Sequence, residues 1–329
     1  MWTYIARRLL QSLVVVIGVT LVSFVALQIG GDPTYLFVSE RATAQEIEVV
    51  RHALGFDRPL HVQYLSFLSD LARGDFGQSL SYRQPALGIV LGALPATIEL
   101  AVFAFVVAIG LAIPLGVVAA LKRGTAVDGS ITILGLLGQS IPNFWMGIML
   151  ILFFGLYLRW FPISGHVPFL TPLLAGDVVT AVTNLPRTLY FLVMPGLTVA
   201  TYSLARNTRL VRSSMLEVLG QDYVRTARAK GLAETTVVVH HALRNAWMPV
   251  VTMVGLEFGF LLGGVVVTET VFSYPGIGRL LFNAINQRDI PLVQCGVILL
   301  AANFILLNTL VDLVYARLDP RVALARSRR

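Results

Sequence analysis

Three polar residues lie inside long apolar stretches of the sequence, where a polar side chain is costly. Glu257 lies well inside the stretch 248–271, Glu269 lies near the end of the same stretch, and Asn143 lies in the stretch 131–158. Inside a membrane such side chains face a cavity or a protein partner, and they often mark the path of a substrate. We therefore take Glu257, Asn143 and Glu269 as candidate pathway-lining residues. A helix–helix hydrogen bond or an interfacial position is the alternative for each.

The sequence lacks the residue patterns of common enzymes. Neither of the two lysines, Lys122 and Lys230, follows a glycine, so no Gly-Lys-Ser/Thr phosphate loop is present. No His-Glu-x-x-His or Gly-x-Ser-x-Gly motif occurs. His240 and His241 are adjacent and would point about 100° apart on a helix, which disfavours a shared metal. We predict that the chain is not an enzyme, with no catalytic residue, no metal site and no cofactor of its own.

The composition requires a membrane environment. Of the 329 residues, 56% are hydrophobic and only 13% are charged, with a mean hydropathy of +0.76. Soluble domains carry about 25% charged residues, so this chain could not cover a soluble surface. A soluble enzyme and a disordered chain are excluded. A disulfide scaffold is excluded as well, because Cys295 is the single cysteine.

The apolar stretches predict an all-α, polytopic membrane protein with six transmembrane helices. A run of about 20 apolar residues crosses the hydrocarbon core as a helix. The second stretch carries one charge, Glu99, near its start. A cleaved signal peptide at Arg7-Arg8 is disfavoured, since Gly30-Gly31-Asp32-Pro33 does not resemble a small-x-small cleavage site. The expected spans are 9–29, 95–121, 131–158, 189–205, 248–271 and 292–311.

Charge placement predicts the orientation of these spans. With six spans, the loops on the side of both termini hold 16 of the 25 Lys and Arg residues, although they are shorter than the opposite set 30–94, 159–188 and 272–291. Lys and Arg accumulate on the cytoplasmic side of a membrane. We therefore expect both termini to be cytoplasmic. This topology explains the net charge of +7 without a nucleic-acid partner.

The first external loop, 30–94, has helical patterns of its own. Thr43 and Glu46 form a capping-box pattern ahead of a short amphipathic helix, and Gly55 is placed to end it. A second pattern follows Pro59 and ends near Gly74. Two short helices fit best. They either pack against the mouth of the bundle or contact a partner that delivers substrate.

The loop 206–247 predicts a helical knob on the cytoplasmic face. Gly220 can end one helix, Asp222 can cap the next, and Gly231 can stop it. A third helix is expected from Ala233–Glu234 towards Pro249. A compact helix–turn–helix of this kind is a shape that the groove of another protein could grip.

These patterns together resemble a known family. The motifs that carry the resemblance are Arg7-Arg8-Leu9-Leu10, Gly31-Asp32-Pro33, Leu60-His61-Val62-Gln63-Tyr64, Gly74-Asp75-Phe76-Gly77, Leu94-Pro95-Ala96-Thr97, Ser140-Ile141-Pro142-Asn143-Phe144-Trp145, the loop Gln221 to Leu232 with His241 to Ala246 and Pro249-Val250, Phe272 to Gly278, Arg288-Asp289 and Leu318-Asp319-Pro320-Arg321. With these motifs in this order, the chain is similar throughout to the permeases of ATP-binding cassette (ABC) importers for dipeptides, oligopeptides and nickel.

The resemblance implies a fold, a location and a set of partners. It implies a single permease domain over 1–329 with the type I ABC importer fold, multi-pass in a bacterial or archaeal plasma (inner) membrane. The implied partners are a homologous second permease, two ATP-binding cassette ATPases that carry the ATP and Mg²⁺, an extracellular substrate-binding protein, and the lipid bilayer. The implied activity is import by alternating access, without a cofactor in this chain.

The resemblance also assigns the ATPase-coupling loop. The permease loop motif falls on Arg225, Thr226, Ala227 and Gly231, and Arg225 stands where the general motif has glutamate. The implied coupling residues are Arg225, Thr226, Ala227, Arg228, Ala229, Lys230, Gly231, Leu232, Ala233, Glu234 and Thr235.

The substrate and one rival function stay open at this point. The stretch 255–264 looks most like the glutathione and dipeptide branch, while similar permeases carry oligopeptides, nickel chelates and some oligosaccharides. The rival function is a self-contained channel or secondary transporter for a small polar solute. It would work without ATP, and the knob weighs against it.

Overall fold

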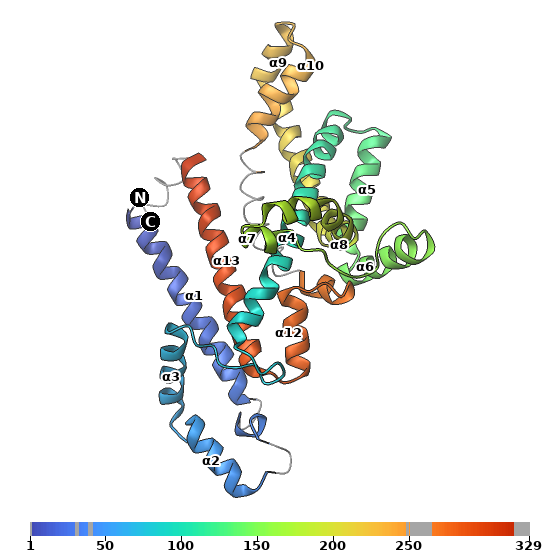
Figure 1. Ribbon diagram of the computed structural model, residues 1–329. Helices are drawn as coiled ribbons and strands as arrows, with labels where there is room; N and C mark the ends of the chain where they lie inside the picture. Colours follow the sequence, from blue (N-terminus) through green and yellow to red (C-terminus); the bar gives the residue numbers. More distant parts are fainter. Residues whose placement is uncertain (1, 30–32, 39–41, 248–249, 251–264, 319–329) are drawn as a thin grey trace. The chain divides into compact units, whose positions relative to one another are not determined.

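The computed structural model describes residues 2–29, 33–38, 42–247, 250 and 265–318 (Figure 1). The described residues are mostly helical, and they contain no strand apart from one isolated bridge between Gln78 and Pro85. Two compact units divide the chain. The first contains described residues of 1–94 and 279–309, and the second contains those of 95–278 and 310–318. The expected all-α architecture is confirmed for the described residues.

The first unit contains the N-terminal helices and the amphipathic loop. The expected capping box is present, because Thr43 Oγ1 accepts from the Glu46 N–H and Glu46 Oε2 accepts from the Thr43 N–H. This helix, α2 (Ala44–Leu54), ends at Gly55, whose φ of 72° is left-handed.

The elements of the first unit are α1 (Trp2–Ile29), η1 (Pro33–Leu36), α2, α3 (Leu60–Ala72), the start of α4 (Ala86–Leu121), most of α12 (Ile277–Asn286) and most of α13 (Ile290–Leu318).

A buried carboxylate in the first unit joins the segment after α3 to the start of α13. The Asp289 side chain is fully buried and accepts from the Ser79 hydroxyl and from the backbone N–H groups of Leu80 (3.1 Å) and Ser81 (3.0 Å). It also caps α13 by accepting from the Leu292 N–H at 3.3 Å. Burial opposes ionisation, but these hydrogen bonds outweigh it and lower the pKa of Asp289.

The second unit is dominated by two long helices that pack closely. A Cβ at Gly116 of α4 would lie 2.6 Å from the Val211 Cβ and 2.8 Å from the Thr208 carbonyl oxygen on α8, so only glycine permits this approach. The second unit contains most of α4, α5 (Ala126–Ser140), α6 (Asn143–Leu150), η2 (Ile151–Tyr157), α7 (Leu170–Leu174), α8 (Val178–Leu219), α9 (Asp222–Ala229), α10 (Glu234–Thr236) and η3 (Val237–Leu243).

The helices differ from the expected spans in length and in one bend. Among the described residues, α4 and α8 are long and apolar enough to cross a membrane, and the pair Ala126–Ser140 and Asn143–Tyr157 would be a third if it forms one span. That pair bends by 106°, because Pro142 disfavours a helical conformation of Ile141, which is extended (ψ 123°). The expected span 131–158 is therefore broken. The span 248–271 lies mostly outside the described residues.

Candidate functional site

Residues 222–236 form the expected helical knob at the end of α8 (Figure 1). Gly220 ends α8 as expected, and α10 begins at Glu234 after Ala233. Gly231 adopts φ +74°, a conformation that side chains other than glycine rarely take. The predicted cap is wrong by one position: Gln221 is the N-cap of α9, and Asp222 is its first helical residue.

The base of the knob packs onto the long helices. Val224 and Ala227 of α9 are buried with Val237 of η3, against Val218 and Leu219 of α8. The next buried cluster continues from η3 into the two long helices, and its members are Ala120, Val211, Met215, Val238, Ala242, Ala246 and Val250. Closely packed interiors transmit displacement rather than absorbing it. The base of the knob is therefore continuous with the packed core that α4 and α8 share.

The exposed face of the knob carries most of the coupling residues that the sequence suggested. Ten of the eleven are exposed, and Ala227 is the buried one. Arg228 donates two hydrogen bonds to Glu234, from Nε at 3.1 Å and from Nη2 at 2.7 Å, and so joins α9 to α10 across the Gly231 turn. The hydrogen bond from Arg228 lowers the pKa of Glu234. This pair braces the knob, while Arg225 is 80% exposed and lies 3.4 Å from Asp222.

A second ion pair, which sequence reasoning missed, joins α5 to α8 near the knob. Arg212 donates to Asp128 from Nε at 2.6 Å and from Nη2 at 2.8 Å, and the Gly124 N–H donates to the same carboxylate. Asp128 precedes the expected span 131–158, and the hydrogen bond from Arg212 lowers its pKa to about 2. In the sequence Arg212 looked like one more positive charge, since nothing local links it to a residue 84 positions earlier.

The three candidate pathway residues differ in their surroundings and in whether the structure describes them. Glu257 lies outside the described residues. Asn143 is half-buried at the start of α6, directly after the bend. Glu269 is fully buried and accepts a hydrogen bond from Thr97 Oγ1 at 2.7 Å, and Thr97 Oγ1 accepts from the Ile277 N–H at 2.8 Å. A pathway role for each stays a prediction.

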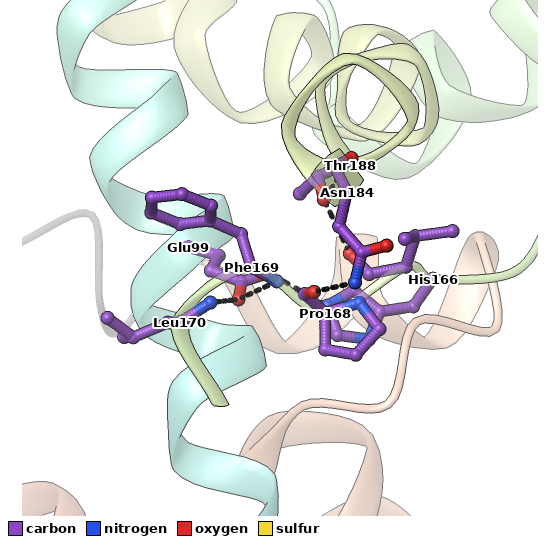
Figure 2. Close-up of polar contacts among 8 residues, drawn as sticks. Glu99, His166, Pro168, Phe169, Leu170, Asn184 and Thr188 are labelled. Atoms are coloured by element: carbon purple, nitrogen blue, oxygen red, sulfur yellow. Dashed lines mark hydrogen bonds and ion pairs between the residues drawn. The ribbon is translucent and has the colours of Figure 1, made fainter. Parts of the chain in front are cut away.

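Glu99, which the sequence marked only as a charge in an apolar stretch, is the centre of a polar cluster in the second unit (Figure 2). Its Oε1 accepts from the backbone N–H groups of Phe169 (3.0 Å) and Leu170 (2.5 Å), and its Oε2 lies 2.8 Å from His166 Nε2. The Glu99 side chain is buried, with 5% of its surface exposed. The cluster holds the segment 166–170 onto α4.

These features define a class of protein. The long apolar helices α4 and α8 pack against the base of an exposed knob that an ion pair braces. This arrangement is typical of an integral membrane transport subunit. Residues 112–324 match the family described as binding-protein-dependent transport system inner membrane component. Residues 1–101 match a second family model, which describes the N-terminal part of the same membrane components. The chain belongs to this family, and it is a permease subunit rather than an enzyme.

Several well-described relatives match over nearly their whole length. The di/tripeptide transport system permease protein DppB of Pseudomonas aeruginosa is 42% identical over 335 residues, covering 98% of this chain and 99% of the relative. The dipeptide transport system permease proteins DppB of Escherichia coli and Alkalihalophilus pseudofirmus are 41% and 40% identical with the same coverage.

Proposed function

We propose that this chain is the membrane-spanning permease subunit of an ABC importer for short peptides, of the dipeptide, oligopeptide or glutathione class. The relatives with 40–42% identity over 98% of the chain carry di/tripeptide and dipeptide permease names. The observation that carries the coupling mechanism is the braced knob, whose buried base packs onto α8 and continues into the core shared with α4.

The proposed topology has six spans with both termini in the cytoplasm. Four of the six expected spans, 9–29, 95–121, 189–205 and 292–311, lie within the single helices α1, α4, α8 and α13. The excess of Lys and Arg in the loops on the side of the termini supports the orientation. The knob then lies on the cytoplasmic face, in an inner membrane.

The proposed mechanism is alternating access driven through the knob. A partner ATPase, which carries the ATP and Mg²⁺, grips the exposed face formed by α9, the Gly231 turn and α10. Its closure displaces the knob, and the packed base passes the displacement to α4 and α8. A homologous permease completes the pathway, a second ATPase completes the motor, and an extracellular binding protein delivers the peptide. The chain needs no cofactor of its own.

Reconstitution tests this function directly. We expect vesicles that contain this chain, its paired permease and both ATPases to take up a labelled dipeptide only when ATP and the loaded binding protein are present. ATP hydrolysis on the partners is the sole energy source in this scheme. The rival channel or secondary transporter predicts uptake by this chain alone, without ATP. Such uptake would overturn the proposal.

Glu257→Ala tests the pathway assignment. If Glu257 lines the pathway, the variant is expected to assemble normally but to change the uptake rate or the preference among peptides, because a carboxylate in the pathway interacts with charged substrate groups. Uptake rates for several dipeptides and tripeptides, measured against the amount of assembled complex, check this. Unchanged rates for all of them would assign Glu257 a structural role.

A further inference from the structure

Three hydrogen-bond donors converge on the buried Glu99 carboxylate. We define the Glu99 clasp as the Glu99 carboxylate with its three donors, His166 and the backbone N–H groups of Phe169 and Leu170 (Figure 2). A hydrogen bond to a charged group is stronger than one between neutral groups. A buried carboxylate that loses its donors is strongly disfavoured. Opening the clasp therefore costs more than breaking the same number of neutral hydrogen bonds.

The same segment is fastened on its other side to α8. Asn184 Nδ2 donates to the Pro168 carbonyl oxygen at 2.9 Å, and Thr188 Oγ1 donates to the Val167 carbonyl oxygen at 2.8 Å. Figure 2 shows the segment lying between Glu99 on α4 and these two side chains on α8. Residues 166–170 thus form a strap between the two long helices. Its hydrogen bonds to α4 go to a carboxylate, and its hydrogen bonds to α8 come from neutral side chains.

A second buried carboxylate reinforces the same end of α4. Glu269 is joined to Thr97, which lies two residues before Glu99 on α4, and the Tyr274 ring packs edge-on against the His166 ring at a centroid distance of 4.9 Å. A Cβ at Gly276 would overlap the Glu269 carboxylate, so the turn after Tyr274 closes directly over this carboxylate. Three segments therefore meet around Thr97 and Glu99: the strap, the stretch from Glu269 to Ile277, and α4 itself.

We infer that the Glu99 clasp is an autoinhibitory contact, which holds α4 and α8 together where the strap joins them and must be released before the two helices can separate there. This inference rests on the proposed function, since alternating access requires the ends of the spans to part. The strap spans only five residues, and its backbone groups are bonded to both helices at once. Separation of the helices must therefore break one set of bonds, and weakening the charged set favours the separated state.

The first test measures ATP hydrolysis by the complete four-subunit complex without binding protein. Glu99→Gln keeps the side-chain volume but removes the charge and turns an N–H₂ group toward the donors. Basal hydrolysis is expected to rise roughly fivefold, because the separated state gains about the difference between a charged and a neutral hydrogen bond. Asp177→Asn is the matched control: Asp177 caps α8 through the Thr180 N–H and lies outside the clasp.

The second test reads the strap itself, without reference to transport. In a Cys295→Ser background, Val167→Cys is labelled with a membrane-impermeant maleimide, and Leu174→Cys, at a position 71% exposed in the native chain, reports general accessibility. Glu99→Gln is expected to speed labelling at position 167 and not at position 174. If Glu99→Gln fails to assemble, His166→Asn, which alters one of the three donors, is measured in the same way.

The outcomes separate the inference from the proposed function. A rise in both basal hydrolysis and labelling supports the clasp. Unchanged labelling, or faster labelling with unchanged hydrolysis, overturns the inhibitory role. A wild-type complex that binding protein and peptide do not stimulate overturns the proposed function instead, and the labelling then decides by itself whether Glu99 holds the strap.

Discussion

Gly231→Trp is expected to abolish peptide uptake while leaving the chain folded and inserted in the membrane. Gly231 lies in the exposed turn of the knob, with no atom within 4 Å of where a Cβ would stand. A side chain there starts in open space, and an indole would block the groove of a partner that grips the turn. A clash at the centre of an interface costs about 3 kcal/mol, and uptake should fall roughly a hundredfold.

Two further variants separate the clash from backbone strain. Gly231 has φ +74°, and a non-glycine residue in this conformation costs about 1–2 kcal/mol. Gly231→Ala measures that cost alone and should retain most of the uptake. Gly124→Trp is the matched control, because Gly124 also has a positive φ (+76°) and open space around it, but lies outside the knob.

The measurements are ATP-dependent uptake and co-purification with the ATPases. We expect Gly231→Trp to lose both and Gly124→Trp to keep both. Full uptake by Gly231→Trp would remove the turn from the coupling interface. An equal loss in Gly124→Trp would instead point to a general effect of tryptophan at left-handed turns.

The largest expected effect on stability comes from Asp289→Ala in the first unit. The alanine removes a buried carboxylate that serves Ser79, the N–H groups of Leu80 and Ser81, and the first turn of α13 through Leu292. Buried donors without an acceptor are costly, and we expect a loss of about 3 kcal/mol in the free energy of unfolding. The unfolding midpoint of the purified chain and its yield in membranes check this.

Control substitutions and pH sharpen this second test. Asp75→Ala is the control, because Asp75 is exposed and accepts from one backbone group, the Gly77 N–H at 2.9 Å. The pKa of Asp289 is lowered, so its stabilisation is complete above the ordinary aspartate value of about 3.9 and is lost as the pH falls through the lower folded value. The difference between wild type and Asp289→Ala should therefore be constant near neutral pH and shrink only in acid. Equal stability of the two proteins at pH 7 would contradict the fastening role of Asp289.

Features that depend on neighbouring residues were predictable from the sequence. The Thr43 capping box, the Gly55 terminus, the end of α8 at Gly220 and the start of α10 at Glu234 all appear where their residue types indicated. Each depends on hydrogen bonds between groups a few positions apart, so the local residues decide them. The helix–turn–helix of the knob followed from the same local signals, while its coupling residues were assigned by the family resemblance.

The bend and the lengths of the helices were less predictable. Hydropathy marks where a chain is apolar, and a helix continues past that boundary wherever its backbone bonds and packing allow it. For this reason α8 extends from Val178 to Leu219, well beyond the apolar stretch 189–205. The break at Ile141–Pro142 had a local signal, the proline, which the uniform hydropathy of the stretch outweighed in the prediction.

The sequence by itself determined the class of this protein: a membrane-embedded, helical permease with little charge in its spans and a helical knob that Gly220 and Gly231 delimit. Composition and local spacing suffice for the membrane location, the helices and the knob, while the permease class follows from the family motifs along the chain. Only the tertiary structure decided the partners of the buried charges. Glu99 meets residues 67 to 71 positions away, Asp289 meets residues 208 to 210 positions away, and Arg212 meets Asp128 across 84. Such pairs depend on how the helices pack, and a buried charge is stable only where that packing supplies its partner.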